Sequence, residues 1–93
     1  MRDEIDDLVE QEARLPGATR ESVLIALVQF DGQLTRRRSK TLADKRRRTM
    51  LHNQAGRILL YFRHGFTAGN TSAEDARLIG LIEALPRSGA KSP

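Results

Sequence analysis

The chain has 93 residues, of which 39% are hydrophobic and 30% charged, and its formal net charge is +4. A chain of this length forms one domain with a small core, because it buries only about 60–65% of the surface that its unfolded form exposes. The absence of cysteine excludes disulfide bonds, a thiolate nucleophile and cysteine metal ligands. The longest apolar run, residues 23–28, is far shorter than the roughly 20 residues that span a bilayer, and the acidic start is unlike a secretory signal. We therefore expect a cytoplasmic protein that does not enter the membrane.

Charge divides the chain into three parts. Residues 1–35 carry three basic and eight acidic side chains, residues 36–63 carry ten basic and one acidic, and residues 64–93 carry three of each. An acidic N-terminal helix, residues 1–15, thus precedes a basic segment at residues 36–48. Like charges this dense repel one another unless a polyanion or an acidic surface neutralises them.

The first segment predicts a helix over residues 3–14. Ile5, Leu8 and Val9 have helical spacing, and acidic side chains gather near the positive end of the helix dipole. Pro16–Gly17 then acts as a stop.

A second helix is predicted from its N-cap, Thr19, to Asp31–Gly32. A strand that feeds a hairpin is the alternative, because Asp-Gly is a strong turn signal. The residues after Gly32 lack the alternating apolar positions that would pair with such a strand. We expect a helix that is buried on most sides.

The longest periodic element is predicted over residues 40–64, with Gly65 as its stop. Gly56 inside it costs about 1 kcal/mol relative to alanine, so we expect another helix to approach closely there. An apolar stripe runs along this helix and is widened by two flanking residues: Leu51, Ala55, Ile58 and Phe62, with Met50 and Leu59.

A last, short helix is predicted to begin at the capping-box pair Thr71 and Glu74 and to end at Pro86. Residues 87–93 are expected to form a flexible tail. Residues 1–86 then make a single helical domain. The fold expected is all-α, a small bundle of about four helices in which the second, third and fourth share a core.

The basic segment is the strongest functional signal in the sequence. Successive arginines on a helix point about 100° apart, so Arg46, Arg47 and Arg48 cannot all face solvent while the helix packs broadly against a core. The start of this helix is therefore expected to project from the body. Because the arginine fork suits phosphate, we predict largely sequence-independent binding to a nucleic-acid backbone, DNA rather than RNA. The predicted binding residues are Arg36, Arg37, Arg38, Lys40, Lys45, Arg46, Arg47 and Arg48.

Three alternatives stay open for this segment. In the first, it forms a solvated arm or pairs with the acidic first helix, which would then mask it from nucleic acid. In the second, it docks on an acidic protein surface, as a small inhibitor or adaptor would. In the third, it belongs to a helix-turn-helix, for which only Ser39, Thr41 and Asp44 supply polar groups other than the charges.

Other candidate sites are weak. His52 and His64 are too few and too far from other ligands for a metal site. Tyr61, Phe62 and Phe66 would allow stacking on RNA bases, yet their spacing fits a core better. We therefore expect no cofactor, no metal and no enzymatic activity.

From Asp44 onward, the order DKRRRTMLHNQAGRILLYF, a short loop and EDARLIGLIEALP resembles small accessory proteins of plasmid conjugation and mobilisation, the TraD and MobC-like families. Residues 1–43 depart from that pattern. The resemblance implies a DNA-binding accessory protein of the transfer machinery without catalysis of its own. It rests on Arg46–Arg48, Gly56, Leu78, Gly80 and Leu81.

A homodimer is a further expectation. The apolar face of the third helix is larger than two short neighbouring helices would cover. A second copy that covers this face would also double the phosphate contacts.

Overall fold

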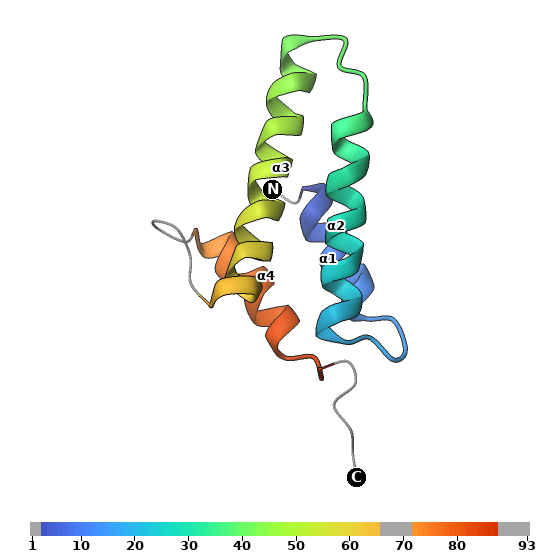
Figure 1. Ribbon diagram of the computed structural model, residues 1–93, viewed down its shortest axis with the longest axis vertical. Coiled ribbons are helices and arrows are strands. Elements are labelled where there is room, and N and C mark those ends of the chain that lie inside the picture. Colours follow the sequence, from blue (N-terminus) through green and yellow to red (C-terminus); the bar gives the residue numbers. More distant parts are fainter. Residues whose placement is uncertain (1–2, 66–71, 88–93) are drawn as a thin grey trace.

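Four α-helices follow one another in the computed structural model, which describes residues 3–65 and 72–87 (Figure 1). They are α1 (Glu4–Ala13), α2 (Arg20–Arg36), α3 (Leu42–His64) and α4 (Ala73–Glu83). The described residues contain no strand, so the all-α prediction is confirmed and the hairpin alternative is wrong. None of these helices is long and apolar enough to cross a bilayer. Apart from Arg87, the predicted flexible tail lies outside the described residues.

Every helix begins at a polar side chain that accepts a hydrogen bond from a backbone N–H of its first turn. Such N-caps satisfy N–H groups that have no partner within the helix. Thr19 is the cap of α2, as predicted. The α4 prediction is wrong by one residue, because Ser72 is the cap and its hydroxyl accepts from the Asp75 N–H, while Thr71 lies outside the described residues. The four caps are Asp3, Thr19, Thr41 and Ser72.

α2 continues past Gly32, which was predicted to end it, and reaches Arg36. Leu34, in this added turn, is fully buried. Burial of a leucine stabilises by roughly 2 kcal/mol, which exceeds the cost of about 1 kcal/mol for glycine inside a helix. The expectation that this helix is buried on most sides is wrong, because Ile25 and Val28 are 57% and 56% exposed.

All four helices contribute to one apolar core. The predicted sharing of a core by the second, third and fourth helices is confirmed, and α1 adds two fully buried residues, Ile5 and Val9. The first helix was not among those expected to share the core, yet its apolar side is part of it. The core consists of Ile5, Val9, Val23, Leu27, Leu34, Leu51, Ala55, Ile58, Leu78, Ile79 and Ile82.

The apolar stripe of α3 faces the other helices rather than a partner chain. The argument for a homodimer through this stripe is therefore wrong. It assumed that only two helices cover the apolar face of α3, whereas α1 also contributes to the core around it. Met50 was expected to widen the stripe and is instead 68% exposed. No neighbouring group comes close to Gly56, where an added Cβ would meet nothing within 4 Å. The stripe itself is made of Leu51, Ala55 and Ile58, with Leu59 and Phe62 packed against the core.

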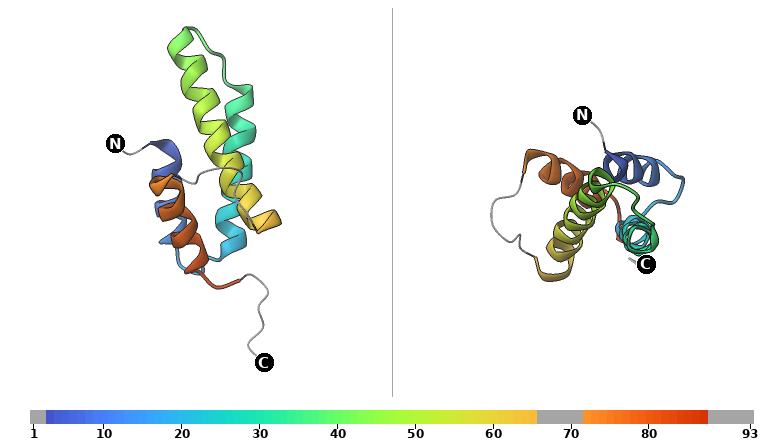
Figure 2. Two further views of the ribbon diagram at one scale, coloured as in Figure 1. Left: turned by 90° about the vertical axis from the view of Figure 1, so that its left-hand side faces the viewer. Right: turned by 90° about the horizontal axis from the view of Figure 1, so that it is seen from above.

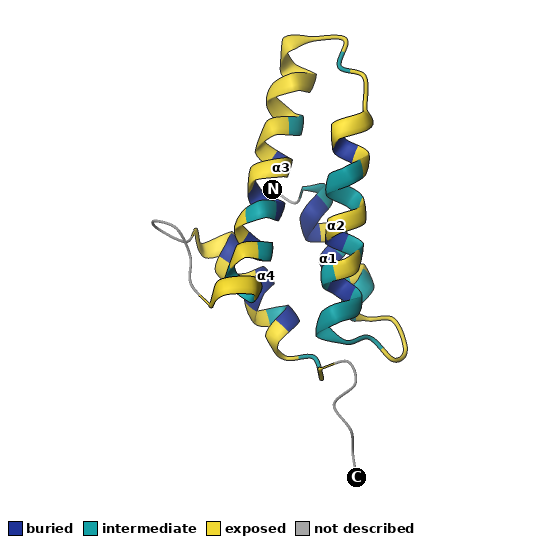
Figure 3. Ribbon diagram, in the orientation of Figure 1, coloured by how far each residue is buried: buried dark blue, intermediate teal, exposed yellow. Residues whose placement is uncertain are grey.

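α2 and α3 form an antiparallel pair whose joined end extends beyond α1 and α4 (Figures 1 and 2). This end lies at one extreme of the long axis of the molecule, which measures 53 × 28 × 23 Å. Exposed residues cover it almost completely (Figure 3). The start of the third helix thus projects from the body, as the arginine spacing indicated.

Candidate nucleic-acid interface

Residues 36–48, which we call the basic tip, cover the projecting end of the α2–α3 pair. They comprise the last residue of α2, the connecting segment 37–41 and the first two turns of α3. Eight of their side chains are basic and one, Asp44, is acidic. All eight predicted binding residues lie in this tip, and all are exposed except Arg48, which is half-buried.

Two of these arginines contact the acidic first helix through one carboxylate, that of Glu4. The Glu4 oxygens lie 3.1 Å from Arg37 Nη2 and 3.4 Å from Arg47 Nη2. The hydrogen bond from Arg37 and the charges of both arginines hold the pKa of Glu4 below its ordinary value of 4.5, against the opposing effect of burial. Arg37 also lies over the Phe30 ring, with its guanidinium carbon 5.7 Å from the ring centroid. The predicted pairing with the acidic helix thus exists at one residue.

Arg48 holds the two helices of the tip together. Its Nη1 donates to the carbonyl oxygen of Arg37 at 2.6 Å. Arg37 is the C-cap of α2, so this cation occupies the negative end of the α2 dipole. The Arg48 side chain is therefore already engaged by the fold.

Five cations of the tip have no ion pair with any residue that the structure describes. Some arginines in other described parts of the chain do have ion-pair partners: Arg57 lies 2.7 Å from Asp75, and Arg77 lies 2.8 Å from Glu10. Lys45 and Arg46 lie near the N-terminus of α3, where the helix dipole disfavours positive charge. At these two positions the uncompensated charge costs stability, whereas Arg36 lies in the last turn of α2, where the helix dipole favours a cation. The five are Arg36, Arg38, Lys40, Lys45 and Arg46.

A small open hollow lies in the tip, between the connecting segment and the first turns of α3. Its volume is about 240 Å³, which is large enough to admit a phosphate group. Four arginines surround it, and the carboxylate of Asp44 is the one acidic group in its wall. Its lining is Arg37, Arg38, Ser39, Asp44, Arg47, Arg48 and Leu51.

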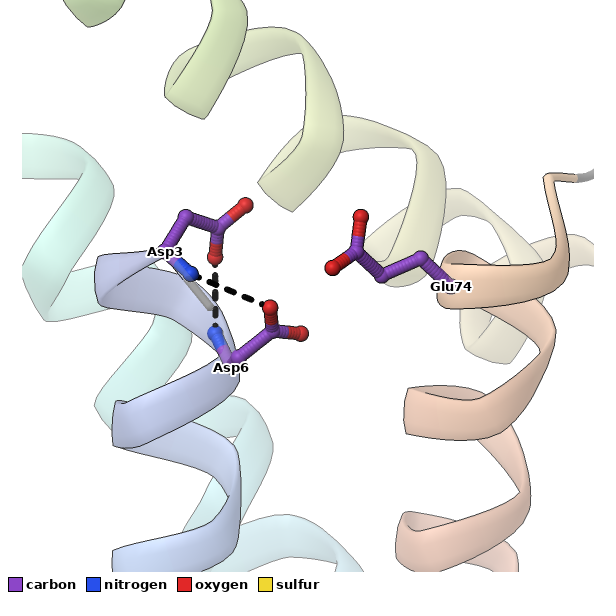
Figure 4. A group of neighbouring side chains, drawn as sticks. All are labelled: Asp3, Asp6 and Glu74. Carbon is purple, nitrogen blue, oxygen red and sulfur yellow. Dashed lines mark hydrogen bonds between the residues drawn. The ribbon is translucent and has the colours of Figure 1, made fainter. Parts of the chain in front are cut away.

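An acidic cluster lies where α1 meets α4, beside the middle of α3 (Figure 4). One carboxylate oxygen each of Asp3, Asp6 and Glu74 lie within 4.8 Å of one another. The Asp3 and Asp6 side chains accept reciprocal hydrogen bonds from each other's backbone N–H groups, and Asp6 also accepts from Arg77 at 3.3 Å. The hydrogen bond to Asp6, with the negative charges of Asp6 and Asp3, raises the pKa of Glu74. These oxygens serve a helix cap and an ion pair, so we assign no metal to them.

Sequence reasoning missed this cluster. Asp3 and Asp6 have capping-box spacing, which was the available signal, but Glu74 comes from the far end of the chain. Only the packing of α1 against α4 brings it near.

The histidines and aromatic residues have structural roles. His52 Nδ1 lies 2.5 Å from Asp31 Oδ1, which links α3 to α2. Tyr61 and Phe62 make an edge-to-face contact with ring centroids 5.2 Å apart and pack against the core, as their spacing predicted. Phe66 lies outside the described residues. The option that these described rings stack on RNA bases is therefore not supported by their placement.

Comparisons with protein-family models, curated proteins and solved structures find no match. The resemblance of the second half of the chain to the TraD and MobC-like families stays a prediction.

Proposed function

We propose that this protein is a small, non-enzymatic nucleic-acid-binding protein with an accessory or regulatory role, and that its basic tip binds the phosphate backbone of DNA. The observation that carries the proposal is the set of five exposed cations without an ion pair among the described residues, gathered on one projecting end. A solvated face would normally mix both signs of charge. Here repulsion is retained at a helix N-terminus, and a polyanion would relieve it.

Arginine chemistry favours phosphate as the partner. Six of the eight basic side chains in the tip are arginines, whose planar guanidinium donates two parallel hydrogen bonds to phosphate oxygens. The start of α3 also favours an anion, because backbone N–H groups and the positive end of the helix dipole lie there. The resemblance to conjugation and mobilisation proteins would make DNA transfer the setting of this activity.

The test is a binding titration against duplex DNA, single-stranded DNA and RNA over several salt concentrations. If five cations meet phosphates on duplex DNA, the logarithm of the affinity falls with the logarithm of salt with a slope of about −4.5. Absence of binding to all three polymers at about 50 mM salt would contradict the proposal. In that case the rival function, docking of the tip on an acidic protein surface, would take its place.

Self-association is a second part of the proposal, through a face different from the one that the sequence suggested. The outer side of α2 carries the exposed Ile25 and Val28, with open space beside Gly32. A second copy packed antiparallel on this side places Ile25 opposite Gly32, and Gly32 opposite Ile25, because the two residues lie equally far from the midpoint after Val28. Such a self-complementary face is what a two-fold dimer requires.

A further inference from the structure

One face of α3 is exposed from the tip to the middle of the helix, and it points away from the core. Its members recur at spacings of three and one, which places them on the side opposite Leu51, Ala55 and Ile58. Every member is exposed. We call this set the outer face of α3: Leu42, Lys45, Arg46, Thr49, Met50 and Asn53.

The outer face carries apolar and uncharged polar side chains beside its cations, which phosphate contacts alone would not need. After Asp44, α3 contains no Asp or Glu through to His64. Leu42 and Met50 are 62% and 68% exposed, although they are apolar. Together with the polar members between them they line a shallow hollow of about 520 Å³. Cationic, hydrogen-bonding and apolar groups therefore alternate along one uncovered helix surface.

The shape of this part of the molecule matches one groove. The beginning of α3 extends beyond α1 and α4 (Figure 2), and of its side chains Arg47 reaches back to Glu4 of α1. The major groove of B-form DNA is about 12 Å wide and admits an α-helix. The major groove of A-form RNA is deep and too narrow for side chains to read. A helix presented in this way therefore suits duplex DNA and not duplex RNA.

We infer that the outer face of α3 enters the major groove of duplex DNA, where Thr49 and Asn53 contact base edges while Arg46 stays on the neighbouring phosphates. This inference rests on the proposed function and adds sequence preference to it. Thr49 and Asn53 lie about one helical turn apart, which is about 6 Å along the axis and close to two base pairs. Asparagine pairs with adenine through two hydrogen bonds, threonine hydrogen-bonds to several base edges, and the apolar members suit thymine methyl groups.

The acidic cluster limits this site on one side. A hollow beside α3 is lined by Met50 and Asn53 together with Asp3 and Glu74. These carboxylates repel phosphates, so the DNA contact ends near Asn53 while the basic tip holds the neighbouring backbone. The charges therefore determine the orientation of α3 on the DNA, with its N-terminal end, in the basic tip, against the phosphate backbone.

The experiment begins with selection of preferred sites from a random duplex DNA library by the full chain. Affinity is then measured for the selected duplex, a scrambled duplex of the same composition and an RNA duplex of the selected sequence. We expect the selected DNA to bind at least about 10-fold more tightly than either other duplex. Asn53→Ala and Thr49→Ala should each reduce that preference, by roughly 5- to 100-fold for the asparagine, without changing the salt slope. Gln33→Ala, an exposed amide on α2, is the matched control and should change nothing.

The outcomes separate the two claims. If DNA binds but no site is enriched, or if Asn53→Ala keeps the full preference, the inference is overturned and backbone binding by the tip stands. Tighter binding of the RNA duplex also overturns it. If no nucleic acid binds, both the inference and the proposed function fail. Thermal melting of each variant by circular dichroism shows that a lost preference is not a lost fold.

Discussion

Arg46 and Arg48 are two residues apart in one basic run, yet the fold uses them differently. Arg48 donates to the Arg37 carbonyl and holds the tip together, whereas Arg46 has no ion pair among the described residues. We expect Arg48→Ala to lower the free energy of unfolding by about 1 kcal/mol, the usual worth of such a hydrogen bond. Arg46→Ala should not lower stability, because it removes a cation from the unfavourable end of the α3 dipole, and it should weaken DNA binding. Thermal and urea unfolding of both variants checks this, and equal stability losses would contradict it.

Two glutamates should respond to pH with opposite signs. The folded-state pKa of Glu4 is lowered, chiefly by its hydrogen bond with Arg37, so its ionised form stabilises the protein above pH 4.5 and this contribution is lost as pH falls through the lowered pKa. The folded-state pKa of Glu74 is raised, chiefly by its hydrogen bond with Asp6. Ionised Glu74 therefore penalises the folded state, and the penalty is relieved as pH falls through the raised pKa toward 4.5.

Substitution by glutamine should expose this difference. At pH 7, Glu4→Gln is expected to lower the Tm and Glu74→Gln to raise it. The difference for Glu74→Gln should shrink as the pH falls toward 4.5, whereas that for Glu4→Gln should persist at pH 4.5 and shrink only below it, as the pH falls through the lowered pKa of Glu4. Melting curves from pH 7 down to about pH 3 measure this. A lower Tm for Glu74→Gln at pH 7 would contradict the cluster as described.

At this scale the sequence predicted the basic residues and one of the four helix caps, because both depend on local chemistry. Thr19 is the cap that its type and position predicted. The pairing of Glu74 with Asp6 joins residues from opposite ends of the chain, which no local pattern relates. The engagement of Arg48 was also hidden, because it depends on the course of the chain between the helices.

Among the helices, α2 offers a clean test of where it ends. Gly32 lies inside the helix, its φ is not positive, and an added Cβ would meet nothing within 4 Å. Gly32→Ala is therefore expected to raise the free energy of unfolding by about 0.5–1 kcal/mol. If the helix instead ended there with a left-handed glycine, as the sequence suggested, alanine would destabilise the protein. Urea unfolding distinguishes the two, with Gly65→Ala, at a φ of +76°, as the strained counterpart.

α1 shows what hydrophobic periodicity does and does not reveal about an element. The spacing of its apolar residues predicted the helix correctly, but its acidity suggested a mask for the basic segment rather than a part of the core. Ile5 and Val9 are fully buried, and Arg77 of α4 pairs with Asp6 and Glu10. Removal of residues 1–15 would therefore damage the core, so a gain or loss of DNA affinity after such a deletion would not report on masking. That α1 joins the core of the other three helices is a tertiary property, which the local sequence pattern did not reveal.

For the whole molecule, the proposed dimer makes a prediction of its own. One helix crossing buries less than the 1,200–2,000 Å² of a typical stable interface, so the dimer should be weak. We expect concentration-dependent association in sedimentation experiments, abolished by Val28→Asp. Leu60→Asp is the matched control, since Leu60 is exposed on α3. A monomer at every concentration up to about 1 mM, where affinity amounts to only about 4 kcal/mol, would contradict it.

The overall shape was predictable in one respect. Three consecutive arginines are incompatible with a helix packed on a broad side, so the projection of the basic tip follows from helical geometry. The acidic cluster beside Asn53 was not predictable in the same way, because it arises only when α1 and α4 meet against α3. The elongated shape with one charged end therefore reflects both local helical geometry and the packing of the helices.

The central claim is that the tip, rather than net charge, binds the nucleic-acid backbone. Its most direct test compares two triple variants that lose the same charge: Arg36→Ala, Arg38→Ala and Arg46→Ala in the tip, against Arg14→Ala, Arg63→Ala and Arg87→Ala outside it. Duplex DNA affinity is measured for both over a salt series. We predict that the tip variant binds more weakly and that its slope flattens from about −4.5 to about −2, while the control keeps the slope of the unmodified protein. Equal losses in the two variants would contradict the claim.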